Sequence, residues 1–331
     1  MLPTFNPNIK RYKYRSLSQQ TPVGSLRERL LSRSRITNLG ALIIGFILAL
    51  SLFSNLRYAF LLSRAARRFS ATPAVIADTI TYNQSISHLD HLIIVAGHAI
   101  WKGGAPEDYT KDSAWVLEAG QTGRGNPDAF YAHIAKGAQI ALADEKSLLV
   151  FSGGQTRKPT HLTEAQSYLS LALASNLLPS SPTTSFTRAT TEDYALDSFQ
   201  NLLFSIARFK ERTGRYPRRV TVIGFGVKRA RFERLHARAL RWGGEFAYVG
   251  VDVAAHADME VARAGELKSG FTPYEHDLYG CHGFLAAKRR SRNTGARFHP
   301  YHISAPELGP LLDWCPSSNE LFSGPLPWKR A

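Results

Sequence analysis

Cysteine is scarce in this sequence: only Cys281 and Cys315 occur among 331 residues. Neither belongs to a C-x-x-C pattern, so the chain has no disulfide framework. Burial as two free thiols is the simpler expectation, and a single bridge is the alternative in an oxidising compartment. Four histidines and an aspartate occur in the same C-terminal region: His276, Asp277, His282, His299 and His302. Their spacing fits no strong metal template, so we predict no metal site.

Acidic residues are nearly absent from the first 70 residues, where Glu28 is the only acid against twelve Lys or Arg. This arm therefore carries +11 of the total net charge of +15, and residues 71–331 carry only +4. Nucleic-acid binding would need a basic stripe on the folded domain, so we expect none. Residues 1–35 also lack a hydrophobic period, and we expect a disordered basic arm there.

No charged residue of either sign occurs in the 21 residues from Ile36 to Leu56. As a helix this run would be about 31 Å long, which matches the hydrocarbon core of a bilayer. A buried core helix would show a polar face, and this run has none. A cleaved signal peptide would have a shorter apolar region that starts earlier. We therefore predict a transmembrane helix at residues 36–57 and a linker at 58–88.

The two flanks of this run differ in positive charge, with eight basic residues before it and four soon after it. The positive-inside rule then places the N-terminus in the cytosol and the large domain across the membrane. Asn83-Gln84-Ser85 is a glycosylation sequon, which fits a lumenal domain. We expect a single-pass signal-anchor protein of the ER or Golgi with a lumenal C-terminal domain. A mitochondrial inner-membrane anchor is one alternative, since the arm is rich in Arg and Ser, and a cytosolic C-terminal domain is another.

The G-x-G-x-x-G fingerprint, the Walker A pattern and the G-x-S-x-G elbow are all missing, so no cofactor class is indicated. Apolar runs instead alternate with helical patterns. Strands are predicted at 92–96, 148–152, 187–191, 219–226 and 246–251, and helices at 127–143, 163–175, 192–212 and 228–240. This alternation is typical of an α/β fold with a doubly wound, mainly parallel, Rossmann-like sheet. We place it at residues 89–255, with residues 256–331 as a C-terminal extension packed on it.

Three predicted strands end in glycine beside polar residues, at Gly97-His98, Ser152-Gly153-Gly154 and Gly224-Phe225-Gly226. Because the carboxyl ends of parallel strands share one edge, ligands bind there. The loop after the second strand leads into a helix that begins at Thr163, and free N–H groups at a helix N-terminus attract anions. Glu164, in the first turn of that helix, either stabilises the helix dipole or faces the ligand.

We therefore expect a site for a small anionic ligand at this edge. His98 is the most attractive titratable group there, as a general base or a phosphate ligand. The candidate catalytic residues are His98, Glu164 and Glu192. The candidate ligand-binding residues are Gly97, Ser152, Gly153, Gly154, Gln155, Thr156, Asn201, Lys228 and Arg231.

A series of short motifs follows the predicted strands. Val95-Ala96-Gly97 and Phe151-Ser152-Gly153-Gly154 end the first two strands, and Glu164-Ala165 opens the next helix. Glu192, Ala195, Ser198 and Asn201 fit the pattern E-x-x-A-x-[ST]-x-x-N, and Arg231 follows a later strand. Over about residues 90–250 this series resembles the DUF218 family, a Rossmann-like group that includes bacterial envelope-associated proteins. The resemblance implies a Rossmann-like fold and a ligand site, but no established activity.

Other features separate this chain from the bacterial members of that family. Bacterial members commonly have a histidine three residues before the motif arginine, where this chain has Lys228. The segments H-A-I-W-K-G-G at 98–104, D-S-F-Q-N-L-L-F-S at 197–205 and L-P-W at 326–328 resemble a fungal membrane-anchored branch. The basic run Lys288-Arg289-Arg290-Ser291-Arg292 is interpreted as a solvated loop, an anionic-lipid contact or a sorting signal.

Together these patterns indicate a membrane-anchored protein that binds a small anionic molecule, phosphorylated or nucleotide-like, and could catalyse transfer or hydrolysis on it. The alternative is a non-catalytic ligand-binding or scaffold protein at an endomembrane. Both use the same predicted pocket.

Overall fold

The computed structural model describes residues 35–69, 72–80, 84–181, 184–253 and 256–328. Contacts between residues divide the chain into two units, Met1–Ala66 and Arg67–Ala331. The sequon residue Asn83 lies outside the described residues.

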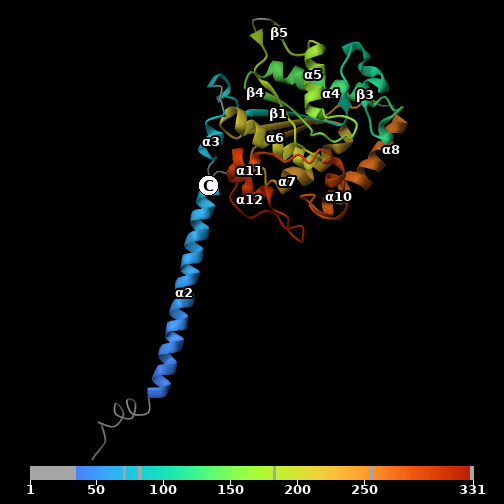
Figure 1. Cartoon of the computed structure of the whole chain (residues 1–331). Coiled ribbons are helices and arrows are strands. Elements are labelled where there is room, and N and C mark those ends of the chain that lie inside the picture. The colour runs from blue at the N-terminus through green and yellow to red at the C-terminus, as the bar shows by residue number, and fades with distance from the viewer. Residues whose placement is uncertain (1–34, 70–71, 81–83, 182–183, 254–255, 329–331) are drawn as a thin grey trace, which may run out of the picture. The chain divides into compact units, whose positions relative to one another are not determined.

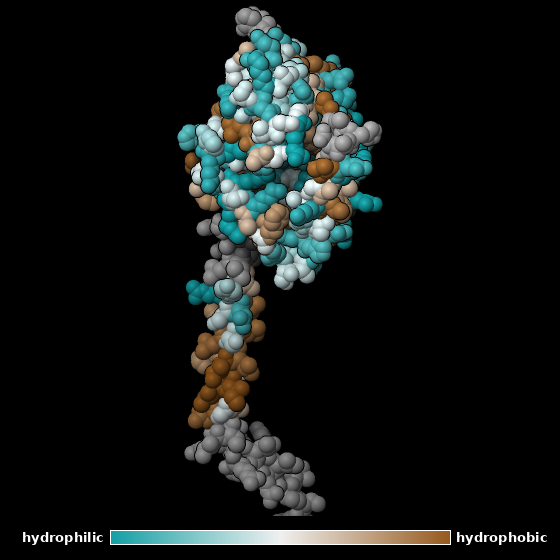
Figure 2. Space-filling model, turned by 90° about the vertical axis from the view of Figure 1, so that its right-hand side faces the viewer, coloured by the Kyte–Doolittle hydropathy of each residue, from teal (hydrophilic) through white to brown (hydrophobic). Residues whose placement is uncertain are grey.

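The N-terminal unit contains all but the last three residues of the helix α2 (Arg35–Phe69). Within it, Leu39–Phe60 is long and apolar enough to cross a membrane, and none of this stretch is buried in protein. Figure 2 shows its hydrophobic side chains, with Leu42 and Phe46 among the most exposed at 69% and 65%. The predicted apolar helix is confirmed, but α2 runs twelve residues past its predicted end at residue 57. The sequence after Arg57 is rich in Leu, Ala and Arg and contains no Gly or Pro, so nothing in it ends a helix.

The α/β unit is built on a five-stranded parallel sheet (Figure 1). Its strands are β1 (His91–Ala96), β4 (Ser147–Ser152), β7 (Ala189–Glu192), β8 (Arg219–Gly224) and β9 (Glu245–Gly250). They lie in the order β7-β4-β1-β8-β9, and every neighbouring pair is parallel. His91 aligns with Ser147 on one side and with Arg219 on the other. The predicted doubly wound, Rossmann-like α/β fold is confirmed.

Both faces of the central strands are covered, as their continuous apolar runs require. Every residue of β1 and β4 is buried. Alternate residues of β1 enter two separate cores: Leu92 and Ile94 pack with α6, whereas Ile93 and Val95 pack with α4 and α5. Figure 1 shows α4 and α5 on the opposite side of the sheet from α6.

Two of the helices that connect the strands, α5 and α6, begin at side-chain caps. Thr163 caps α5 (Glu164–Ala174) by accepting a hydrogen bond from the Gln166 N–H at 2.9 Å. Asp197 caps α6 in the same way, and Gly214, with a φ of 75°, ends it. The connecting helices are α4 (Asn126–Ala143), α5, α6 (Ser198–Thr213) and α7 (Ala237–Ala239).

Two predicted helices differ from the structure. The helix expected at 192–212 begins only at Ser198, because Glu192 belongs to the end of β7 and Asp197 is the cap. The helix expected at 228–240 is interrupted: a 3-10 turn, η5 (Gly226–Lys228), is followed by the π-helical segment η6 (Arg231–His236) and then by α7. Wide turns of this kind often occur at functional sites.

The C-terminal segment contributes to the core beside α6. Tyr274, Tyr301 and Leu308 are each no more than 1% exposed and belong to the same cluster as Leu92. Its elements are α8 (His256–Glu266), η7 (Leu267–Phe271), α9 (Thr272–His276), α10 (Gly283–Arg292), α11 (Tyr301–Ser304), η8 (Pro306–Leu308) and α12 (Gly309–Leu312).

Short elements complete the α/β unit. Before β1 these are α3 (Ala74–Ala77) and η1 (Gln84–Ile86), and between β1 and α4 they are β2 (Ile100–Trp101), η2 (Pro106–Thr110), η3 (Asp112–Ala114), β3 (Trp115–Val116) and η4 (Ala119–Gln121). The small hairpin of β5 (Ser180–Ser181) and β6 (Thr184–Ser185) precedes β7.

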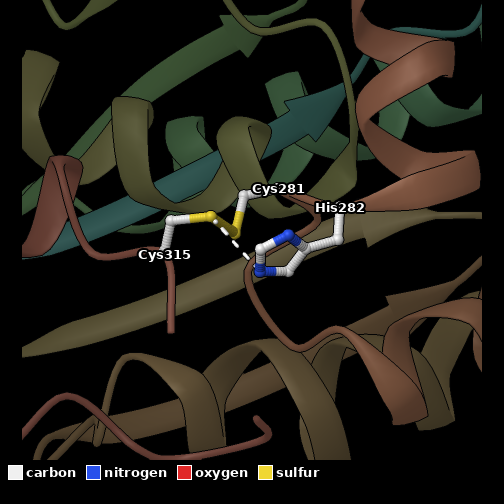
Figure 3. Close-up of side chains that lie close together, drawn as sticks. All are labelled: Cys281, His282 and Cys315. Atoms are coloured by element: carbon white, nitrogen blue, oxygen red, sulfur yellow. Dashed lines mark hydrogen bonds between the residues drawn. A yellow bond between two sulfur atoms is a disulfide. The ribbon is translucent and has the colours of Figure 1, made fainter. Parts of the chain in front are cut away.

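Cys281 and Cys315 form a disulfide across this C-terminal segment (Figure 3), with their Cα atoms 5.9 Å apart. The expectation of two buried free thiols is therefore wrong, and Cys315 is exposed. Cys281 lies in the turn before α10, and Cys315 lies in the chain after α12. Because 34 residues separate the two cysteines, the sequence alone does not reveal that they are close in space. His282 Nε2 lies 3.4 Å from Cys315 Sγ. Because the two sulfurs are bonded to each other, they are not thiolate ligands for a metal.

Candidate functional site

A cavity of about 490 Å³ opens where the order of the sheet reverses, between the carboxyl ends of β1 and β8. From β1 the chain proceeds outward through β4 and β7, and then crosses to β8 and β9 on the other side. Such a switch point is where open α/β sheets bind ligands, and the volume suits a small molecule. Gly97 and His98 after β1, and Phe225 and Lys228 after β8, line the cavity.

Segments far away in the sequence complete the wall. The long loop between β1 and α4 contributes Glu118 and Arg124, and α6 contributes Asn201. The C-terminal segment contributes further groups, namely Met259, Glu266, Tyr274, Leu285, Lys288 and Arg292. The wall is therefore partly apolar and partly charged.

Six of the twelve predicted site residues line this cavity, and six do not. Those that line it are Gly97, His98, Glu164, Asn201, Lys228 and Arg231. Those that do not are Ser152, Gly153, Gly154, Gln155, Thr156 and Glu192.

Glu164 occupies a space that two glycines leave open. A Cβ atom added at Gly97 would lie 2.6 Å from the Glu164 Cβ, and one at Gly153 would lie 2.5 Å from Glu164 Oε2. The carboxylate accepts a hydrogen bond from Thr156 Oγ1 at 2.5 Å and lies 3.7 Å from Arg157 Nη1. Burial raises the pKa of Glu164, and the nearby positive charge of Arg157 opposes that rise. The glycines at these strand ends thus make room for a side chain that lines the cavity.

The loop at 153–157 does not line the cavity, but it holds residues that do. Gln155 Nε2 donates to the Thr160 carbonyl at 2.8 Å, and Arg157 Nη2 donates to the His98 carbonyl at 2.8 Å. Arg157 also pairs with Glu118 at 3.1 Å and is only 7% exposed. Its guanidinium is therefore already occupied by protein groups, and it holds the β1 end and the long loop in place.

Glu192 belongs to a fully buried polar network. Its carboxylate accepts hydrogen bonds from Ser152 Oγ at 3.0 Å, Tyr301 Oη at 3.0 Å and the Tyr194 and Ala195 N–H groups at 2.9 and 3.2 Å. Burial raises the pKa of Glu192 to about 7, and three of these donors, on Tyr194, Ser152 and Tyr301, oppose the rise. Ser152 also donates to Asn201 Oδ1 at 3.1 Å, so Asn201 joins this network to the cavity.

His98 is held between an aromatic ring and a lysine. Its imidazole stacks on Phe225 with the ring centroids 5.0 Å apart, and its Nδ1 lies 3.2 Å from Lys228 Nζ. Burial, with the positive charge of Lys228 second, lowers the pKa of His98 well below its usual value. The ring is therefore neutral at neutral pH, and its Nδ1 accepts a hydrogen bond from the Lys228 ammonium.

The positive charges of the cavity differ in whether a carboxylate balances them. Arg231 pairs with Glu266 at 3.1 Å, and Arg292 pairs with Glu118 at 3.1 Å. Within the described parts of the chain, neither Lys228 nor a second cavity residue, Lys288, forms an ion pair with a carboxylate. Two cations are thus left without a matching charge.

The sequence does not predict that α10 forms part of the cavity wall. Its basic run was interpreted as a solvated loop, a lipid contact or a sorting signal, but Lys288 and Arg292 line the cavity and Arg289 pairs with Asp197. Only Arg290 and Ser291 of this run are exposed. The four-residue spacing of Lys288 and Arg292, which puts both on one face of a helix, was the available signal.

Comparison with known proteins adds one relative. The chain is 28% identical over 282 residues to a protein of Saccharomyces cerevisiae named "Uncharacterized protein YOR238W", a match that covers 70% of this chain and 93% of the relative. No family model matches the chain, so the resemblance to the DUF218 family stays a prediction. No solved structure matches it either. The function must therefore be argued from the site.

Proposed function

We propose that this chain is a DUF218-like, membrane-anchored protein whose α/β domain binds a small anionic molecule, phosphorylated or nucleotide-like. The observation that supports this most is that Lys228 and Lys288 line a cavity at the switch point of the sheet and form no ion pair with any carboxylate in the described part of the chain. A buried or half-buried charge is costly unless it is paired, so such a cavity favours an anion. Phe225, stacked on His98, adds a flat apolar surface beside the cations.

The binding proposal is tested with the full chain in detergent micelles, by thermal unfolding in the presence of matched pairs of compounds. Glucose 6-phosphate and glucose form one pair, and AMP and adenosine form another. The phosphorylated member of at least one pair should raise the melting temperature, because ligands that bind the folded state stabilise it. If no phosphorylated compound changes the melting temperature more than its neutral partner, the proposal is wrong.

Catalysis of transfer or hydrolysis is a second candidate function, and Glu164 favours it. This carboxyl group lines the cavity and has a raised pKa, as an acid–base group requires. For any phosphorylated compound that binds, phosphorus NMR of the mixture should then show slow turnover. The Glu164→Gln variant should bind but not turn over. Binding without turnover in the wild type supports the alternative of a non-catalytic ligand-binding or scaffold protein.

We further propose that the α/β domain is lumenal in the ER or Golgi. The disulfide between Cys281 and Cys315 supports an oxidising compartment. The excess of basic residues before the apolar run Ile36–Leu56 supports the matching orientation, with the N-terminus in the cytosol. Protease protection of intact vesicles tests this orientation: the domain should be protected until detergent is added. Cleavage without detergent would instead support the alternative of a cytosolic domain.

A further inference from the structure

Lys228 and Lys288 approach the same cavity from two parts of the α/β unit that are far apart in the sequence. Lys228 ends the turn η5 after β8, and Lys288 lies in the middle of α10 in the C-terminal segment. Both side chains are half-buried and both line the cavity. Among the residues that the structure describes, the partners of each amine are neutral: Lys228 Nζ lies 3.2 Å from His98 Nδ1 and 5.4 Å from the centre of the Phe225 ring, and Lys288 Nζ lies 5.8 Å from the centre of the Phe284 ring.

The other charged groups of the cavity leave this pair uncompensated. Arg231 and Glu266 balance each other, and Arg289 holds the carboxylate of Asp197. Two carboxylates and two guanidinium groups form a further balanced set: Glu118 pairs with both Arg157 and Arg292, and Glu164 lies 3.7 Å from the buried Arg157. The two remaining charged groups are exposed: Arg124, and Asp252, whose Oδ1 accepts the Gly226 N–H at 2.9 Å. These last two offset each other, so the surplus charge of the cavity resides on the two lysines.

We propose that Lys228 and Lys288 together bind one doubly charged phosphate monoester group, with the Arg231 guanidinium beside them. Two ammonium groups match the charge of a dianion, whereas a phosphodiester carries one charge and would leave one lysine unpaired. This inference rests on the proposed anion-binding function and specifies its ligand class. It also assigns to α10 a part of the site, so that the C-terminal segment and the parallel sheet share one ligand.

The protonation of the two lysines gives this binding a further signature. Burial and the positive charge of Arg231 lower the pKa of Lys228 to about 7. Burial and Arg292 lower the pKa of Lys288 to about 8. Glu266 opposes the first shift, and Glu118 and Asp197 oppose the second. A bound dianion favours both ammonium forms, so binding at pH 8 should take up protons.

The test compares methyl phosphate, a dianion at pH 8, with dimethyl phosphate, a monoanion, as probes of the full chain in detergent micelles at constant ionic strength. Affinity comes from calorimetric titration, repeated in two buffers with different ionisation enthalpies. Methyl phosphate should bind at least about tenfold tighter than dimethyl phosphate, since the monoanion loses one of the two charge-assisted contacts. The observed binding enthalpy of methyl phosphate should be more positive in the buffer with the larger ionisation enthalpy, because the protein takes up protons that the buffer releases.

Variants locate the effect. Lys228→Met and Lys288→Met should each weaken methyl phosphate at least about tenfold and reduce the proton uptake, while dimethyl phosphate should change less. Lys146→Met is the matched control, because Lys146 is exposed in the turn before β4, at the other edge of the sheet. Circular dichroism should show that all three variants fold.

Two outcomes would overturn the inference, and they differ in whether the proposed anion-binding function is refuted as well. Equal affinities for the two probes, unchanged by either variant, would refute the two-lysine site but leave anion binding in the cavity intact. No binding of either probe, together with no effect of the phosphorylated compounds on the melting temperature, would refute the proposed function as well.

Discussion

Lys228 Nζ lies 3.2 Å from His98 Nδ1 and so joins the ends of the two strands between which the sheet order reverses. The resemblance to the DUF218 family, which stays a prediction, aligns Lys228 with a position where bacterial members commonly have a histidine. His98 lies at the neighbouring strand end, and its lowered pKa leaves the imidazole neutral beside the lysine. A neutral acceptor positions the ammonium without cancelling its charge, which leaves that charge available to an anion.

Replacing Lys228 should stabilise the protein in the absence of ligand. Its pKa is lowered to about 7 in the folded state, against about 10.4 in an unfolded chain, so the unfolded state binds more protons between these values. The stability of the wild type should therefore rise as the pH increases from about 7 to about 10. Lys228→Met should gain about 1 kcal/mol at pH 6 and lose this advantage by pH 10. Urea denaturation across this pH range measures both, and Lys146→Met should keep the pH dependence of the wild type and gain no stability over it at pH 6.

Glu192 should show the opposite dependence on pH. Its pKa is raised to about 7, so the folded state binds more protons than the unfolded state between about 4.5 and 7. This carboxyl group should therefore make the protein less stable as the pH rises through that window. Glu192→Gln should abolish that slope and cost about 1–3 kcal/mol, because its amide would face the donors that now serve the carboxylate. Denaturation at pH 5 and pH 7 tests this, and an unchanged slope in the variant would contradict it.

Gly97 should not tolerate a side chain. The reason is packing against Glu164, and not the fact that Gly97 precedes the candidate catalytic residue His98. A Cβ atom there would meet the Glu164 Cβ at 2.6 Å and the Ser152 carbonyl at 3.0 Å. We expect Gly97→Ala to cost about 1–3 kcal/mol of stability. Gly309→Ala is the matched control, since its Cβ would have no neighbour within 4 Å. Similar melting temperatures for the two variants would show that Glu164 is not packed as described.

The disulfide should make a measurable contribution to stability. Closing a loop of 34 residues stabilises a fold by about 3–4 kcal/mol in the chain-entropy account. Paired Cys281→Ser and Cys315→Ser substitutions should lower the melting temperature, and a reductant should do the same to the wild type but not to the variant. Reaction of the unreduced protein with a thiol-specific reagent should detect no free thiol. A stoichiometric reaction at two sites would contradict the bridge.

Much of this architecture follows from local patterns in the chain. The aliphatic runs at 92–96 and 148–152 have no polar alternation, which only a strand covered on both faces explains, and the structure buries both. The order β7-β4-β1-β8-β9 then puts the Gly97-His98 end beside the end of β8, as the switch-point argument requires. Strand existence and the edge that carries the cavity were therefore predictable.

What the sequence could not show depends on distant pairings. Ser152 faces a buried partner and not a ligand, because it donates to Glu192, which is 40 residues further along the chain. Glu192 in turn accepts from Tyr301, which is another 109 residues away. Likewise, the charge run that contains Lys288 looks like solvated surface until α10 is packed against the cavity. Local spacing identifies helical faces, but it does not say which face meets which cavity.

The central claim is that the cavity at the end of β1 and β8 holds an anionic small molecule through Lys228 and Lys288. Native mass spectrometry of the full chain, purified under mild conditions in nanodiscs and compared with the Lys228→Met/Lys288→Met double variant, tests this most directly. The account predicts that methyl phosphate, or an anionic molecule retained from the cell, adds mass to the wild type and not to the folded double variant. Equal retention by both proteins, or by neither at saturating methyl phosphate, would contradict it.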